Sequence, residues 1–160
     1  MQVARLNNLT IRPSDLHDAE PLLFRLQPHA GVNRVKNGWL IAPGGGVDEA
    51  VFGPYAARPA GHYRVLVGFE PETSLPCPDV IRSIRVQINV TVDARTRELA
   101  PRRVVTLKPS TLASGQCMMS GEIDFSTSTP VTKIETPIWV QSAELPVRLT
   151  RYSLQRADGN

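Results

Sequence analysis

The chain has 160 residues, of which 41% are hydrophobic and 21% charged, and its formal net charge at pH 7 is +3. This composition lies in the range of globular domains and excludes the disordered and collagen-like classes. The longest apolar runs fall well short of the ~18 residues that a membrane helix needs, so we expect no membrane partner. A chain of this length can bury ~70% of its unfolded surface, which favours a single domain over residues 1–160.

The basic residues are spread along the chain. Fifteen of the eighteen cationic residues are Arg, and the adjacent basic pair is Arg102 and Arg103. Proteins that bind nucleic acids usually gather basic residues on one face or one helix, so we expect no specific nucleic-acid partner. The N-terminus has no basic start followed by an apolar stretch, and so predicts no secretory signal.

The first half of the chain predicts short strands and at most one short helix. Pro and Gly, numbering 14 and 11, interrupt every region that could keep the apolar spacing of a long helix. Ser14 can cap a short helix that Pro21 ends. The strands expected in this half of the chain cover residues 3–6, 8–12, 37–43, 49–53 and 61–70.

The clearest strands alternate apolar and polar side chains. In residues 61–70, Tyr63 and Phe69 lie on the same face, and the polar residue His62 lies on the other. Residues 80–93 continue the pattern, and residues 102–108, 117–126, 133–141 and 146–155 follow. In the last of these the apolar phase slips by one residue near Thr150, which predicts a β-bulge.

About nine or ten short strands result, separated by Gly/Pro turns and not by helices. Such a pattern is typical of an antiparallel arrangement rather than a parallel α/β sheet. We therefore expect an all-β fold: an antiparallel β-sandwich of jelly-roll topology.

Two stretches resemble a known family. VFGPYAARPAGHYRVLVGFE (residues 51–70) resembles carbohydrate-binding-module-like jelly rolls, in which a GPY turn and a Pro-Ala-Gly turn bracket a Tyr-x-Val strand. Residues 121–157 are similar to the last strands of such domains. The resemblance covers roughly the last two thirds of the chain and implies a jelly roll of the kind found in surface-glycan proteins and phage virion components. It carries over no sugar-binding residue position by position.

The sequence shows no strong catalytic motif. His17, His29 and His62 lack the spacing that places two imidazoles on one metal, and no serine elbow or phosphate-binding loop is present. We therefore expect no metal, no cofactor and no enzymatic activity. Glu122 and Asp124 share one strand face, where they could act as a glycosidase pair or hold calcium; the solvated face of an edge strand is the simpler interpretation.

Cys77 and Cys117 are the two cysteines of the chain. They form a disulfide only if the fold brings their Cα atoms within ~7 Å. Because no secretion signal is predicted, we favour two unpaired thiols.

Aromatic residues and one histidine are the candidates for ligand or partner binding. Trp139 falls at the outward phase of its strand, where a place in the core is harder to explain. Tyr55 lies in the GPY turn, and His62 is at an outward position. Trp39 is a weaker candidate because its apolar neighbours favour the core.

Two functional hypotheses follow. The first is a non-catalytic structural protein whose partners are other subunits of an assembly, including copies of itself, most concretely a bacteriophage head decoration or tail element located in the virion. The alternative is a glycan-binding module of a bacterial surface-polysaccharide system, for which we expect a cytoplasmic location because no signal peptide or transmembrane segment is predicted.

Overall fold

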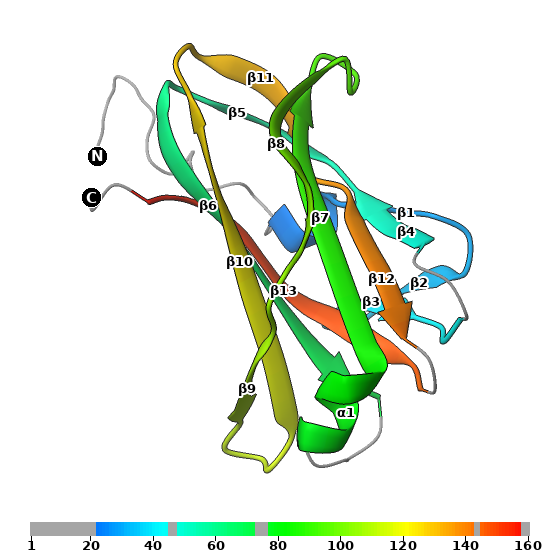
Figure 1. Cartoon of the computed structure of the whole chain (residues 1–160). Helices are drawn as coiled ribbons and strands as arrows, with labels where there is room; N and C mark the ends of the chain where they lie inside the picture. Colours follow the sequence, from blue (N-terminus) through cyan, green and yellow to red (C-terminus); the bar gives the residue numbers. More distant parts are fainter. Residues whose placement is uncertain (1–21, 45–47, 73–76, 143–144, 158–160) are drawn as a thin grey trace, which may run out of the picture.

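The computed structural model describes residues 22–44, 48–72, 77–142 and 145–157, which form two antiparallel sheets (Figure 1). The seven-stranded sheet contains β1 (Gln27–Pro28), β4 (Asp48–Phe52), β5 (Pro54–Arg58), β7 (Ile84–Val92), β8 (Arg97–Val104), β11 (Val131–Glu135) and β12 (Ile138–Ser142). The six-stranded sheet contains β2 (Val32–Val35), β3 (Gly38–Ile41), β6 (Gly61–Pro71), β9 (Lys108–Thr111), β10 (Cys117–Thr127) and β13 (Val147–Arg156). The described helices are η1 (Leu22–Arg25), a 3-10 turn, and α1 (Cys77–Ser83).

The strand pairs are nested in the manner of a jelly roll. β3 pairs with β13, β4 with β12, β5 with β11, and β6 with β10, while the β7–β8 hairpin is innermost. β4 and β5 follow each other in one sheet, as do β11 and β12, so the β4–β12 and β5–β11 pairs count as one interrupted pair. Counted in this way, the successive pairs alternate between the two sheets. A long hairpin rolled in this way gives the expected all-β sandwich of jelly-roll topology.

The described residues contain thirteen strands, more than the nine or ten expected, partly because two long strands are each broken once. Gly53 (φ 102°) separates β4 from β5, and Thr136 and Pro137 separate β11 from β12. The two breaks face each other, since the amide of Thr136 donates a hydrogen bond to the carbonyl oxygen of Gly53 at 2.7 Å. One paired interruption therefore turns two strands into four.

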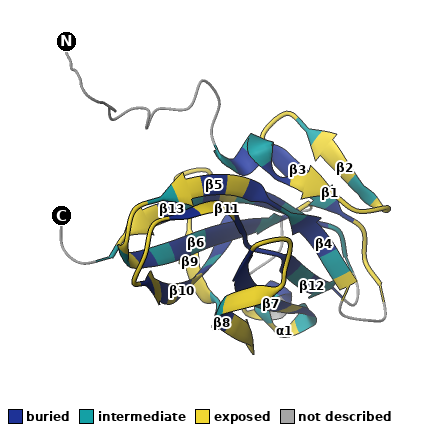
Figure 2. Ribbon diagram, turned by 90° about the horizontal axis from the view of Figure 1, so that it is seen from above, coloured by how far each residue is buried: buried dark blue, intermediate teal, exposed yellow. Residues whose placement is uncertain are grey.

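The core lies between the sheets and follows the predicted alternation. On β6, the side chains of Tyr63, Val65, Val67 and Phe69 are no more than 1% exposed, while His62 is exposed on the other face. Buried and exposed segments alternate in the same way along β5 (Figure 2). Burial of this kind contributes about 25 cal/mol for each Å² of apolar surface removed from water.

Three expectations need correction or fall outside the described residues. Residues 80–83 belong to α1 and not to a strand, because Pro78 fits the first helical turn and the fully buried Val80 packs into the core. The strand expected at 102–108 begins earlier, at Arg97, and leaves its sheet after Val104 to reach β9 in the other sheet. The helix expected at 14–20 and the strands at 3–6 and 8–12 lie outside the described residues.

The β-bulge predicted near Thr150 is confirmed. The register of β13 against β6 shifts between Leu149 and Arg151. On either side of this shift, Leu149 and Tyr152 both point into the core, which explains the slipped apolar phase in the sequence.

Cys77 and Cys117 are joined by a disulfide, with their Cα atoms 5.2 Å apart. The preference for two unpaired thiols is thus wrong, because the fold places α1 against the first residues of β10. The bond ties the helix to the six-stranded sheet. Within the described residues, no helix has the length and apolar character required to cross a membrane.

We expect Gly38→Ala to destabilise the fold by about 1–3 kcal/mol, because overpacked sites cost this much. A Cβ at Gly38 lies 2.0 Å from the carbonyl oxygen of Leu149, which is backbone and cannot rotate away. Urea unfolding followed by circular dichroism measures the loss. Gly44→Ala is the matched control, since nothing lies within 4 Å of its Cβ. Equal stability of the two variants contradicts the prediction.

Replacing both cysteines by serine should lower the free energy of unfolding by about 2–4 kcal/mol, because the bond closes a long loop in the unfolded chain. The loop spans 40 residues. Urea unfolding of the wild type with and without a reductant should show the same loss. A wild type that is insensitive to reductant and as stable as the double variant contradicts it.

Candidate functional site

The four sequence-predicted binding residues lie in three different places. Tyr55 and Trp139 both lie on the outer face of the seven-stranded sheet, from β5 and β12. His62 lies on the outer face of the six-stranded sheet, where its Nδ1 is 2.5 Å from the hydroxyl of Ser126. Trp39 is 5% exposed and donates a hydrogen bond to the carbonyl oxygen of Leu23, so it belongs to the core and not to a binding site.

An arginine fork lies between Tyr55 and Trp139. The guanidinium of Arg95 donates hydrogen bonds to both oxygens of Glu49, one of them at 3.0 Å, and to Oε2 of Glu135 at 2.7 Å. The hydroxyl of Tyr55 approaches the same Glu135 oxygen at 3.5 Å, the outer limit of a hydrogen bond. Glu49 lies opposite Trp139 in the pairing of β4 with β12. These five residues, Glu49, Tyr55, Arg95, Glu135 and Trp139, form what we call the outer-face cluster.

The carboxylate side chains of the outer-face cluster are more buried than the side chain of its arginine. The side chains of Glu135 and Glu49 are 5% and 11% exposed, whereas that of Arg95 is 39% exposed. His29 adds a contact from its Nε2 to Glu49 at 3.3 Å. A buried carboxylate that loses its cation is left as an uncompensated charge, so the fork also stabilises this face of the sheet.

The contacts shift the pKa values of three groups. Burial acts to raise the pKa of Glu49, but hydrogen bonds from Arg95 and His29 outweigh it and lower the pKa from its ordinary value of 4.5. Hydrogen bonds to Glu49 and Glu135 raise the pKa of Arg95 above its usual range. Burial, together with the charge of Glu135, raises the pKa of Tyr55. At neutral pH Glu49 is therefore a charged carboxylate, Arg95 a guanidinium cation and Tyr55 a neutral phenol.

Backbone strain gathers around this cluster. Asp93, Ala94 and Arg95 have φ values of 57°, 55° and 69°, so three consecutive non-glycine residues are in the left-handed region. Tyr55 at 62° and Lys133 at 55° are the other two such residues described, and Lys133 is two positions before Glu135. Each such residue costs of order 1–3 kcal/mol and persists only where the surroundings enforce it. In this turn the left-handed backbone accompanies a side chain of Arg95 that reaches back over the sheet to Glu49 and Glu135.

The Trp139 end of the cluster is ordered by polar neighbours. The indole Nε1 donates a hydrogen bond to Oδ1 of Asn89 at 3.2 Å. The guanidinium of Arg102 lies 3.8 Å above the indole ring and is held by a 2.6 Å hydrogen bond to Gln87. Such a cation–π stack contributes about 0.5–1 kcal/mol at an exposed site. Trp139 is half-buried and keeps a fixed orientation.

Thr91 adds a polar group beside Glu135. It lies opposite Glu135 in the pairing of β11 with β7 and is 2% exposed. Its hydroxyl oxygen has no hydrogen-bond partner among the described residues. Buried polar groups are rarely left in this state.

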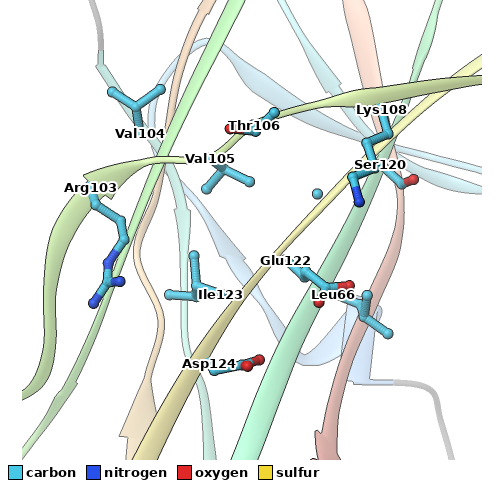
Figure 3. A pocket seen from close by; sticks show the side chains of 11 residues that line it. Leu66, Arg103, Val104, Val105, Thr106, Lys108, Ser120, Glu122, Ile123 and Asp124 are labelled. Atoms are coloured by element: carbon cyan, nitrogen blue, oxygen red, sulfur yellow. The ribbon is translucent and has the colours of Figure 1, made fainter.

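Glu122 and Asp124 occupy a different hollow, of about 390 Å³, where the connection from β8 to β9 passes over β10 (Figure 3). Both carboxylates are exposed, and β10 pairs with β9 only through Ser120, so Glu122 and Asp124 lie where β10 is the edge of its sheet, as expected. Arg64 contacts both, at 3.0 Å and 2.9 Å. The protein's own arginine therefore occupies the position that a calcium ion would need. No group of three or more His, Cys, Asp or Glu residues in the described part of the chain is arranged to hold a metal.

Sequence reasoning missed Glu49, Arg95 and Glu135. The three are separated by at least 40 residues along the chain, and no local pattern links them. The turn that carries Arg95 contains no glycine to signal its left-handed backbone. The strand Val131–Glu135 reads VTKIE, in which Glu135 is one more polar residue beside Thr132 and Lys133, so the sequence carries no signal of its burial.

Comparisons with known proteins are sparse. No protein-family model matches the chain, and no curated protein matches it. Among solved structures, the chain is similar to one described as "AvmM Catalyzes Macrocyclization in Alchivemycin A Biosynthesis", with 11% identity and a TM-score of 0.39 over 74% of this chain and 73% of that chain.

The prediction that the chain is not an enzyme is contradicted by this likeness, because the similar structure belongs to a catalyst of macrocyclization. We therefore do not keep that prediction. At this TM-score, the likeness carries no argument about which reaction or residues this chain would use.

The contribution of Glu49 to stability should fall in acid. Its pKa is lower in the folded than in the unfolded state, so its stabilising effect is complete above the unfolded value of 4.5 and is lost as the pH falls through the folded value. Glu49→Gln should therefore destabilise the protein at pH 7, and the difference from wild type should shrink toward pH 3. Urea unfolding at each pH measures this. Glu98→Gln, at an exposed position on β8, is the control; a pH-independent effect of Glu49→Gln would refute the assignment.

Proposed function

We propose that the chain binds carbohydrate on the outer face of its seven-stranded sheet. The observation that carries this proposal is the placement of Tyr55 and Trp139 on one sheet face, on either side of the Glu49–Arg95–Glu135 fork. Aromatic rings provide flat apolar surfaces at low entropic cost, and such surfaces suit the apolar faces of sugar rings. Arg102 covers one face of the Trp139 indole, whereas the ring of Tyr55 is exposed.

The fork supplies the polar half of such a site. Carboxylates accept hydrogen bonds and a guanidinium donates them in a fixed planar geometry, which matches neighbouring hydroxyls on a sugar. Ligand sites typically combine a few placed polar groups with aromatic lining in this way.

The rigidity of the face also supports the proposal. Arg95 is held by two carboxylates and Trp139 by Asn89, so little side-chain freedom is lost when a ligand binds. The left-handed turn at residues 93–95 is a costly conformation at an exposed loop. Such conformations gather at sites where a residue must be held in place for a ligand.

Assembly with other subunits, as in a virion, is the second candidate. Val104 is 49% exposed on β8, which ends the seven-stranded sheet on the side away from β12. The neighbouring Pro101, Arg102 and Arg103 are residues of the kind that prevent edge pairing with another chain. We therefore rank a glycan ligand above a subunit interface at this edge.

We expect Trp139→Ala and Tyr55→Ala each to lower the affinity for the polysaccharide that retains the wild type by about tenfold or more. The reason is that a lost central aromatic contact commonly costs over 1.4 kcal/mol. The measurement is retardation on a panel of immobilised bacterial and plant polysaccharides, followed by titration calorimetry with the retained one. His62→Ala, on the opposite sheet, is the matched control and should bind as the wild type does.

Two outcomes contradict the proposal. One is a wild type that is retarded by no polysaccharide of the panel. The other is retention that His62→Ala abolishes and Trp139→Ala leaves unchanged, which would move the site to the other face. Thermal unfolding of each variant confirms that the fold is intact.

A further inference from the structure

A second hollow lies on the six-stranded sheet, away from the outer-face cluster. It has a volume of about 700 Å³ and crosses β13 and β6 beside η1. Pockets for small molecules typically have volumes of about 300–1,000 Å³. Its lining includes Leu23, Phe24, Leu66, Arg151, Ser153 and Gln155.

The topology explains the hollow. β3 pairs with β13 through Leu149 and no further, and η1 contacts β13 beyond the end of this pairing. The bulge at Thr150 shifts the following residues, so that Arg151 lies opposite Gly68, which has no side chain. The 3-10 turn thus forms one wall of the hollow, and the outer face of the sheet forms its floor.

The charges of the hollow are one-sided. Among the described residues that line it there is no Asp or Glu, and Arg151 is the one charged residue. Other arginines of this sheet are engaged elsewhere: Arg64 contacts Glu122 and Asp124, and Arg148 contacts Glu72 at 3.0 Å. Arg34 stacks on the ring of Phe24, 3.8 Å from its centroid. Arg151 forms no ion pair with any described residue. An exposed guanidinium thus faces an apolar surface without an anion to match it.

We propose that this hollow binds a small amphipathic anion, whose carboxylate-type head pairs with Arg151 and whose apolar body packs against Phe24 and Leu66. A charge-assisted hydrogen bond from arginine to a carboxylate is the stronger kind, and it is often bidentate. Ser153 and Gln155 provide hydrogen-bonding groups at the same rim. The site is on the opposite sheet from the proposed carbohydrate site and does not depend on it.

The test is titration calorimetry of the full chain with decanoate and, as a cationic ligand of the same length, decylammonium. We expect the wild type to bind decanoate and to prefer it over decylammonium by at least tenfold. Arg151→Glu should weaken decanoate binding by tenfold or more and remove the preference. Arg85→Glu makes the same charge change at an exposed position on the other sheet, and should leave both affinities unchanged.

The apolar part of the site is tested by chain length. Affinity for the wild type should rise from butyrate to decanoate, and Leu66→Ala should flatten this rise while keeping the preference for anions. The proposal is overturned if the wild type binds no decanoate, if Arg151→Glu binds it as tightly as the wild type, or if Arg85→Glu causes the same loss. Variants that lose polysaccharide binding, such as Trp139→Ala, should still bind decanoate.

Discussion

The apolar interior shared by the two sheets is the constraint on which the other features depend. Tyr63, Phe69, Ile88 and Leu149 are no more than 1% exposed, and they come from strands of both sheets. Each strand gives alternate side chains to this interior, so a shift by one residue would move its apolar set into water. The register is therefore strongly fixed, and with it the position of every side chain on the two outer faces.

The two outer faces use this fixed register differently. On the seven-stranded sheet, strands distant in sequence bring carboxylates, a guanidinium and two aromatic rings together, with Arg95 at the centre. On the six-stranded sheet, Arg64 and Arg148 are matched by carboxylates, while Arg151 is left beside an apolar hollow. One face thus offers a polar, aromatic surface and the other an apolar hollow with a single positive charge.

The sequence predicts those parts of the fold that depend on local alternation. The inward set of β6, the phase slip at Thr150 and the outward direction of Trp139 all follow from a period of two. Contacts made by folding are not visible in this way. The Arg95 fork joins residues 40 and 46 positions apart. α1 takes the first four residues of the strand expected at 80–93, because its apolar residues fit either structure.

The nested order of the strands has a consequence for how the chain folds. The outermost pair, β3 with β13, brings together residues such as Asn37 and Arg148, whose side chains form a hydrogen bond across 111 positions of sequence. Chains dominated by such distant contacts fold slowly, on the millisecond to second scale, because loop entropy is lost before the contacts form. Until β13 pairs with β6, that edge of β6 is open to water and to other chains. Closure of this pair therefore competes with pairing between chains, and the competition grows with protein concentration.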